Sequence, residues 1–168
     1  FPLTVIGNIP YYISSPIIER IIKNSADVRV AYVTVQKEFA ERIAARAGSK
    51  AYGSFTCFVQ YYAHAKILFD ISRGCFQPPP SVDSCLLKVI PKKEEELVPV
   101  DRDMLSITIR TAFGQRRKTL RNSLKDVYSA AAIESFCRSR NLSVDVRPEA
   151  LTLRDFIDLT SYFSQKNN

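Results

Sequence analysis

The chain has 168 residues, of which 46% are hydrophobic, and this is enough to bury one sizeable core or two small ones. It carries 24 basic and 17 acidic side chains, which gives a net charge of +7 and a sequence pI near 9.3. This balance favours a polyanionic partner over acidic proteins or neutral substrates. No apolar run is long enough for a membrane span and no signal-peptide pattern is present, so we expect a cytoplasmic protein.

The cysteines are widely separated along the chain and lie at Cys57, Cys75, Cys85 and Cys137. The sequence has one histidine, His64, that could join them as a ligand. Short, paired cysteine spacings are typical of zinc sites and disulfide frameworks, and this sequence has no such spacing. We therefore predict reduced thiols and no metal site.

A short turn sequence, Asn-Ile-Pro-Tyr at 8–11, follows an apolar run at 3–7 that predicts a buried strand. After it, a Ser-Pro pair and isoleucines at helical spacing predict a helix over 15–23. The turn is thus expected at the C-terminal end of a strand, where open α/β sheets bind their ligands.

The residue types in this turn suit the methylation of a planar amine such as that of adenine. Such a nitrogen is a poor nucleophile until acceptors on its N–H bonds favour rehybridisation, and the Asn8 side-chain oxygen and the Ile9 carbonyl are suitable acceptors. Pro10 presets the direction of that carbonyl, and Tyr11 offers a ring on which an extruded base can stack. An ordinary strand-to-helix turn is the alternative interpretation.

The remainder of the first portion alternates between strand and helix patterns. Strands are predicted over 28–35, 65–71 and 85–90, and helices over 37–46 and 54–62. Between them lie a turn-rich segment at 48–53 and a stiff, proline-rich extended loop at 76–83. A charged stretch at 91–96 closes this portion and predicts a linker.

Everything after about residue 100 has a helical pattern. From Arg110 to Lys125 there are six basic residues and no acidic one. A helix starting near Arg116 would place Leu120, Leu124 and Val127 on a packing face. It would place a stripe of cations, Arg117, Arg121 and Lys125, on the adjoining face. Such a stripe can follow a phosphate backbone, although a solvated helix face is the alternative. The predicted RNA-binding residues are Lys50, Arg110, Arg116, Arg117, Lys118, Arg121 and Lys125.

Three successive runs, 8–16, 76–84 and 113–120, resemble the signatures of the small-subunit rRNA adenine dimethyltransferases. The resemblance covers nearly the whole chain, from 1 to about 160. It implies an S-adenosylmethionine-dependent enzyme that dimethylates two adjacent adenines near the 3′ end of small-subunit rRNA during ribosome biogenesis. It also implies that small-subunit rRNA or the pre-ribosomal small subunit is the partner, with no membrane and no metal.

The same resemblance assigns roles to individual residues. Asn8, Ile9, Pro10 and Tyr11 would form the adenine site, and Asn8 would also border the methionine end of the cofactor. Phe76 would cover the flipped base, unless it is a core aromatic instead. The helical tail would hold the rRNA.

The chain departs from the family pattern at its start. The family's Gly-rich cofactor loop and ribose-binding acid are missing, because the five glycines form no such cluster. The chain resembles part of a Rossmann-like class I methyltransferase α/β sheet that begins near the fourth strand, followed by a small all-α domain. We expect domains at 1–92 (catalytic) and 101–168 (rRNA-binding), with a linker at 93–100. We also expect poor cofactor binding, no turnover by this chain alone and an exposed sheet edge.

Three other functions stay open at this point. A large-subunit rRNA methyltransferase of the antibiotic-resistance type shares the turn at 8–11, although the triple proline after Phe76 favours the small-subunit enzymes. A non-catalytic nucleic-acid-binding factor of the same fold is a second alternative, and the intact Asn8 and Tyr11 argue against it. A basic α/β domain without a site would require all three motifs to be coincidental.

Overall fold

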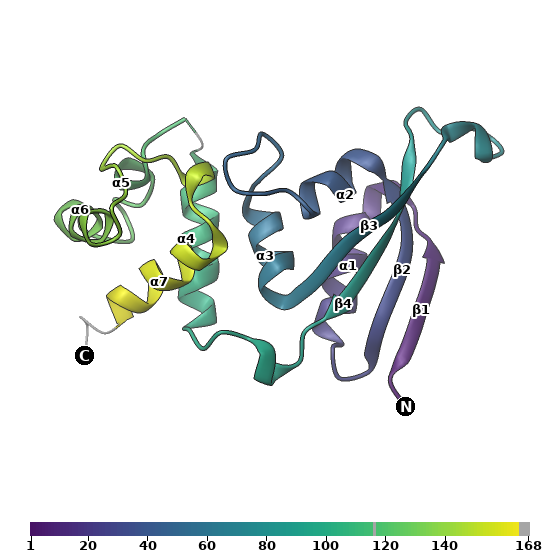
Figure 1. The fold of residues 1–168 in the computed structure, drawn as a ribbon, viewed down its shortest axis with the longest axis horizontal. Helices are drawn as coiled ribbons and strands as arrows, with labels where there is room; N and C mark the ends of the chain where they lie inside the picture. The colour runs from purple at the N-terminus through teal and green to yellow at the C-terminus, as the bar shows by residue number, and fades with distance from the viewer. Residues whose placement is uncertain (116, 165–168) are drawn as a thin grey trace. The chain divides into compact units, whose positions relative to one another are not determined.

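The computed structural model describes residues 1–115 and 117–164 (Figure 1). The chain forms two compact units. The first consists of Phe1–Ala45 and Phe58–Leu97, and the second of Arg46–Cys57 and Val98–Asn168. The second unit therefore includes a segment of the portion that the sequence pattern attributes to the sheet.

The first unit is built on a four-stranded sheet whose order is β1-β2-β4-β3. Its strands are β1 (Leu3–Asn8), β2 (Val28–Gln36), β3 (Ala63–Ile71) and β4 (Ser84–Pro91). β1 and β2 are parallel, as their connection through helix α1 (Ser14–Lys23) requires, whereas β4 runs antiparallel to both β2 and β3. This mixed α/β sheet agrees with the fold class expected from the sequence.

Burial alternates along the central strands, because one face of the sheet packs against helices. In β4 the side chains of Cys85, Leu87 and Val89 are fully buried. The residues that alternate with them on the other face, Leu86, Lys88 and Ile90, are only half-buried. Helices α1 and α2 (Lys37–Ile43) contribute the facing apolar residues, among them Ile18 and Ile43. In β2 burial alternates from Ala31 to Val35, whereas Val30 and Ala31 are both buried, next to a register shift in the pairing of β2 with β1.

β1 lies at an edge of the sheet and, among the described residues, pairs only with β2. Its side chains are correspondingly exposed, with Leu3 at 60% and Ile6 at 80% of full exposure. The backbone groups on the outer side of this strand lie open to a further strand.

The second unit contains four α-helices within the described ranges. They are α4 (Arg102–Gly114), α5 (Leu120–Ser123), α6 (Ala130–Ser139) and α7 (Leu153–Ser164). Side chains cap three of these helices: Asp101 accepts from the N–H of Met104, Thr119 caps α5, and Ser129 caps α6. The core between them includes Leu124, Ile133, Phe136, Phe156 and Leu159, each at most 1% exposed.

The segment Arg46–Cys57 joins this unit through specific contacts. Gly48, whose φ of +84° requires a residue without a side chain, donates its N–H to the Glu149 carbonyl at 2.7 Å. The ring of Tyr52 packs edge-on against Phe113 at a centroid distance of 5.7 Å. These contacts explain why a turn-rich sequence inside the sheet portion belongs to the helical unit. The helix α3 (Ser54–Tyr62) follows, and its residues are divided between the two units.

The prediction of one continuous helix that starts near Arg116 is wrong. α4 ends at Gly114, and a new short helix, α5, begins only after Thr119, whose side chain accepts from the N–H of Asn122 at 3.4 Å. Glycine at the end of one helix and a threonine cap at the start of the next separate the two. The cations from 117 to 125 therefore do not form one helical stripe, and Arg116 lies outside the described residues. Of the predicted packing face, Leu120 and Leu124 are fully buried, whereas Val127 is half-buried.

Candidate functional site

A cavity of 290 Å³ lies at the C-terminal end of β1. Its lining joins two segments that are about seventy residues apart in the sequence: Asn8, Ile9, Pro10 and Tyr11 from the turn, and Phe76, Pro78 and Pro80 from the proline-rich loop. Its volume is near the lower limit for small-molecule sites, which are usually about 300–1,000 Å³. The structure thus brings together all five residues that the sequence assigned to one adenine site.

The backbone of the turn is held by the neighbouring strand. Asn8 is the last residue of β1 and is paired with Thr34 of β2, and the N–H of Ile9 donates to the Thr34 carbonyl at 3.4 Å. Pro10 is extended, with φ −59° and ψ 131°, and a 3₁₀ turn over Tyr11–Ile13 follows. Among the described residues, no side chain forms a hydrogen bond with the Asn8 carboxamide. Its oxygen is therefore available to accept from a ligand.

Tyr11 is held at both ends. Its carbonyl accepts from the Ser14 hydroxyl at 3.0 Å, and its phenolic hydroxyl lies 2.5 Å from the hydroxyl oxygen of Ser84. Ser84 is the first residue of β4 and is fully buried. Its role was not indicated by the sequence, because 73 positions separate the two partners and a single serine carries no pattern.

Asp83, at the C-terminal end of the loop that carries Phe76, holds both ends of this loop in place through hydrogen bonds. The Asp83 carboxylate accepts from the N–H of Arg73 at 3.0 Å, and its carbonyl accepts from the N–H of Lys37 at 3.0 Å. The guanidinium of Arg73 also reaches the carbonyl of Ser81 at 3.5 Å. Phe76 itself is half-buried and lines the cavity.

The cavity lining consists of neutral side chains, so the arrangement can orient and stack a ligand but offers no side-chain acid or base. An ion pair joins Lys37, which directly follows β2, to Asp70 near the end of β3. The Lys37 Nζ and the Asp70 Oδ2 are 2.5 Å apart. The hydrogen bond that the Lys37 ammonium donates to Asp70 raises the pKa of this ammonium. In the described part of the chain, no cluster of three or more metal-ligating side chains is found. No helix there is long and apolar enough to cross a membrane.

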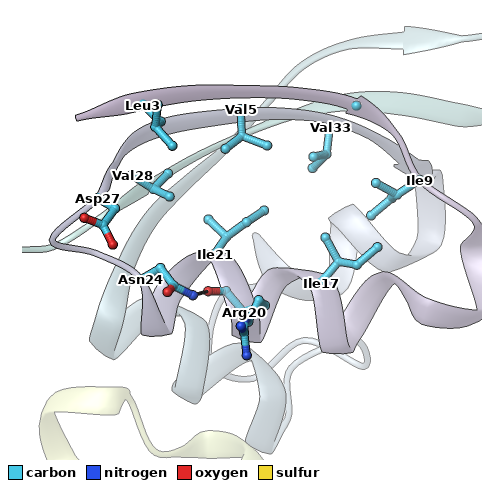
Figure 2. A pocket seen from close by; sticks show the side chains of 11 residues that line it. Leu3, Val5, Ile9, Ile17, Arg20, Ile21, Asn24, Asp27, Val28 and Val33 are labelled. Carbon is cyan, nitrogen blue, oxygen red and sulfur yellow. Dashed lines mark hydrogen bonds between the residues drawn. The ribbon is translucent and has the colours of Figure 1, made fainter. Parts of the chain in front are cut away.

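A second cavity, of 390 Å³, lies between β1 and α1 (Figure 2). Figure 2 shows Leu3 and Val5 of the strand facing Ile17 and Ile21 of the helix across it. Ile9 lines both cavities, so the turn separates the polar mouth at Asn8 from this apolar space. Apart from Arg20, Asn24 and Asp27, the residues that line this cavity are apolar or glycine.

The predicted RNA-binding residues all belong to the helical unit. The side chains of Lys50, Arg110, Arg117, Lys118 and Lys125 are exposed. Arg121 is instead half-buried and forms an ion pair with Glu134. The sequence pattern did not indicate this ion pair, because the two residues are thirteen positions apart.

Charge is distributed unequally between the two units. The sequence ranges of the helical unit contain 14 basic and 8 acidic side chains, a net charge of +6. Those of the sheet unit contain 10 basic and 9 acidic side chains, a net charge of +1. The excess positive charge of the chain therefore resides mainly in the helical unit.

The mixed sheet, with two parallel strands followed by an antiparallel pair, belongs to the Rossmann-like methyltransferases. A dimethyladenosine transferase from Plasmodium falciparum superposes with a TM-score of 0.78 at 28% identity, covering 99% of this chain and 69% of that one. The 23S rRNA methyltransferase ErmE shares the fold, with a TM-score of 0.75 at 18% identity and coverage of 98% and 66%.

The family model described as ribosomal RNA adenine dimethylase matches residues 1–165. The chain belongs to that family. Two relatives named ribosomal RNA small subunit methyltransferase A are similar to it. The one from Levilactobacillus brevis is 35% identical over 167 residues, and the one from Acinetobacter baylyi is 37% identical over 159. The alignments cover 96% and 95% of this chain but only 56% and 57% of those relatives.

Proposed function

We propose that the protein is an S-adenosylmethionine-dependent rRNA adenine N6,N6-dimethyltransferase acting on two adjacent adenines near the 3′ end of small-subunit rRNA during ribosome biogenesis. The observation that carries this proposal is the cavity that joins Asn8, Ile9 and Tyr11 to Phe76. The names of the curated relatives support the choice of the small subunit. The four free thiols support a reducing compartment such as the cytoplasm.

The adenine is proposed to enter the cavity after leaving its helix, with its ring against Tyr11 and Phe76. The Asn8 oxygen and the Ile9 carbonyl then accept from its exocyclic amine, so that the lone pair of the nitrogen turns toward the methyl donor. Because the lining is neutral, the proton released after transfer passes to solvent. Positioning rather than acid–base catalysis is therefore the contribution of these residues.

S-adenosylmethionine supplies an electrophilic methyl group when it is bound. The carboxamide of Asn8 lines the cavity and would suit a place beside the methionine end of this cofactor. We propose that the main cofactor loop lies in the part of the relatives that this chain does not align with. On this basis the chain alone binds the cofactor poorly and does not turn over.

The sheet portion at 1–92 is proposed to be catalytic and the helical portion at 101–168 to bind rRNA, with a linker at 93–100. The exposed cations Arg117, Lys118 and Lys125, together with the net charge of the helical unit, support this division. Lys50 and Arg110 are proposed to add to the same surface charge. Arg116 is included on its sequence alone.

The test uses the full-length protein with labelled S-adenosylmethionine and either undermethylated small subunits or large subunits. The RNA is then digested and its nucleosides are separated. Dimethyladenosine in small-subunit rRNA is expected. The same product in large-subunit rRNA would support the resistance-type alternative, and tight, salt-sensitive RNA binding without any product would support a non-catalytic factor.

A further inference from the structure

The hydroxyl groups of Ser84 and Tyr11 share a hydrogen bond at 2.5 Å that links the two halves of the candidate site. Tyr11 belongs to the turn after β1, whereas Ser84 directly follows the proline-rich loop that carries Phe76. Ser84 is fully buried although its side chain is polar, and a buried hydroxyl normally has a partner. The phenol of Tyr11 is the partner that the structure provides.

Ser84 is a rigid point from which to hold a side chain. β4 lies between β2 and β3, and Ser84 is paired with Gln36 on one side and with Ile71 on the other. Its neighbour Asp83 is fixed by the N–H groups of Arg73 and Lys37. The position of the Ser84 hydroxyl is therefore set by backbone pairing on both sides.

Among the described residues, the bond to Ser84 is the hydrogen bond that the Tyr11 hydroxyl makes. Its backbone is held by the 3₁₀ turn and by the Ser14 hydroxyl, but the ring is only half-buried at the edge of the cavity. The phenolic oxygen lies on the rotation axis of the second side-chain torsion, so the position of this oxygen fixes only the first torsion. A phenol donates and accepts hydrogen bonds close to the plane of its ring, so the direction of the bond to Ser84 favours one ring plane. A stacking surface is useful only if that plane matches the plane of the base.

We propose that Ser84 is a positioning residue for methyl transfer, which holds the Tyr11 ring in the orientation that stacks the target adenine. This inference rests on the proposed function. Ser84 itself does not line the cavity, so its effect passes through Tyr11. Loss of the bond is expected to reduce kcat by about tenfold, the scale of one hydrogen bond, while the affinity for RNA stays the same.

The experiment is a double-mutant cycle in the full-length enzyme with Ser84→Ala, Tyr11→Phe and both together. Tyr11→Phe keeps the ring and removes only the hydroxyl. Because Tyr11 is only half-buried, this variant is expected to stay folded. Each single variant should lower kcat by a similar factor, and the double variant should be no slower than either. Additive losses, or no loss in Tyr11→Phe, would overturn the inference.

The matched control is Thr108→Val in the helical unit. Thr108 shares a buried hydrogen bond with the Tyr128 hydroxyl at 2.7 Å, so this variant removes the same kind of bond from the unit that does not contain the cavity. It should lower thermal stability without changing kcat, which separates positioning from a general loss of packing. An inactive wild type would refute the proposed function itself, whereas an active wild type with an additive cycle would refute only the role of Ser84.

Discussion

Arg121 of α5 donates to the carboxylate of Glu134 in α6 at 2.6 Å, and Arg138 approaches the other oxygen of the same carboxylate at 3.7 Å. The hydrogen bond that the Arg121 guanidinium donates to Glu134 raises the pKa of this guanidinium. One member of the basic run is therefore used to join two helices. Its neighbours Arg117 and Lys125 are exposed and, among the described residues, have no carboxylate partner.

This difference predicts unequal effects on RNA binding. Arg117→Ala and Lys125→Ala should each weaken binding and reduce the slope of log K against log salt by about 1, because each phosphate contact releases a counterion. Arg121→Ala should change the slope less, since its charge is already neutralised locally. Fluorescence anisotropy of an rRNA fragment over a salt series measures all three. Equal slope changes would contradict the assignment.

The rings at the cavity should contribute through stacking. Tyr11→Ala or Phe76→Ala in the full-length enzyme is expected to raise the barrier by about 1–3 kcal/mol, the range found for one stacked base. Tyr12→Ala is the control, because Tyr12 is 87% exposed and does not line the cavity. The measurement is kcat/KM for methylation of small subunits. A loss in Tyr12→Ala as large as that in Tyr11→Ala would show that the cavity does not define the site.

Asp83 should control the mobility of the loop that carries Phe76. Asp83→Ala removes the acceptor for the N–H of Arg73, so the segment beyond it should open more often. Trypsin cleavage after Arg73 in the native protein is expected to become several-fold faster, because losing one hydrogen bond lowers the free energy of local opening by about 1 kcal/mol. Asp126→Ala, an exposed acid of the helical unit, should leave this cleavage rate unchanged. Equal rates in Asp83→Ala and wild type would refute the pinning of the loop.

Alkaline pH should destabilise the fold through its buried thiols. Burial raises the pKa of Cys57 from 9.0 to about 11, and burial also raises that of Cys85 to about 11. The unfolded chain therefore loses these protons first, so the stabilisation is complete below pH 9 and is lost as the pH rises toward 11. For Cys57 the loss is about 3 kcal/mol. Lys92, whose pKa is lowered by burial, acts in the opposite direction, so a comparison with variants is needed.

The measurement is denaturant unfolding of wild type and Cys57→Ala between pH 7 and 11. The variant should show a flatter dependence on pH above 9, although it is less stable overall. Cys75→Ala serves as the control because this cysteine is exposed. A pH profile of Cys57→Ala that is parallel to wild type would contradict the stated cause.

The sequence predicted the elements of the sheet unit well, because strands and helices there follow clear hydrophobic periods. The run at 28–35 became β2, and the serine at 54 became the start of α3. The meeting of Asn8 with Phe76 was expected only through the family resemblance, since no local pattern reports a contact over that distance. The Ser84 bond to Tyr11 has no signal in a single sequence at all.

The basic segment shows where periodicity alone fails. The leucines at 120 and 124 fit a longer helix, but the same two positions fit the short helix that begins after Thr119. Glycine at 114 and threonine at 119 are the local signals that could have indicated the break. The assignment of 46–57 to the helical unit depends on tertiary contacts of Gly48 and Tyr52. No local sequence pattern indicates these contacts, because their partners are far away in the sequence.

The central claim is that Asn8 holds the amine that accepts the methyl group. The most direct test is single-turnover methylation of undermethylated small subunits by full-length wild type and Asn8→Ala, with RNA binding measured in parallel. We predict that Asn8→Ala binds RNA as wild type does but transfers methyl groups on the order of 100-fold more slowly, as expected when a preorganised hydrogen-bonding partner is removed. Transfer by Asn8→Ala at the wild-type rate would contradict the account.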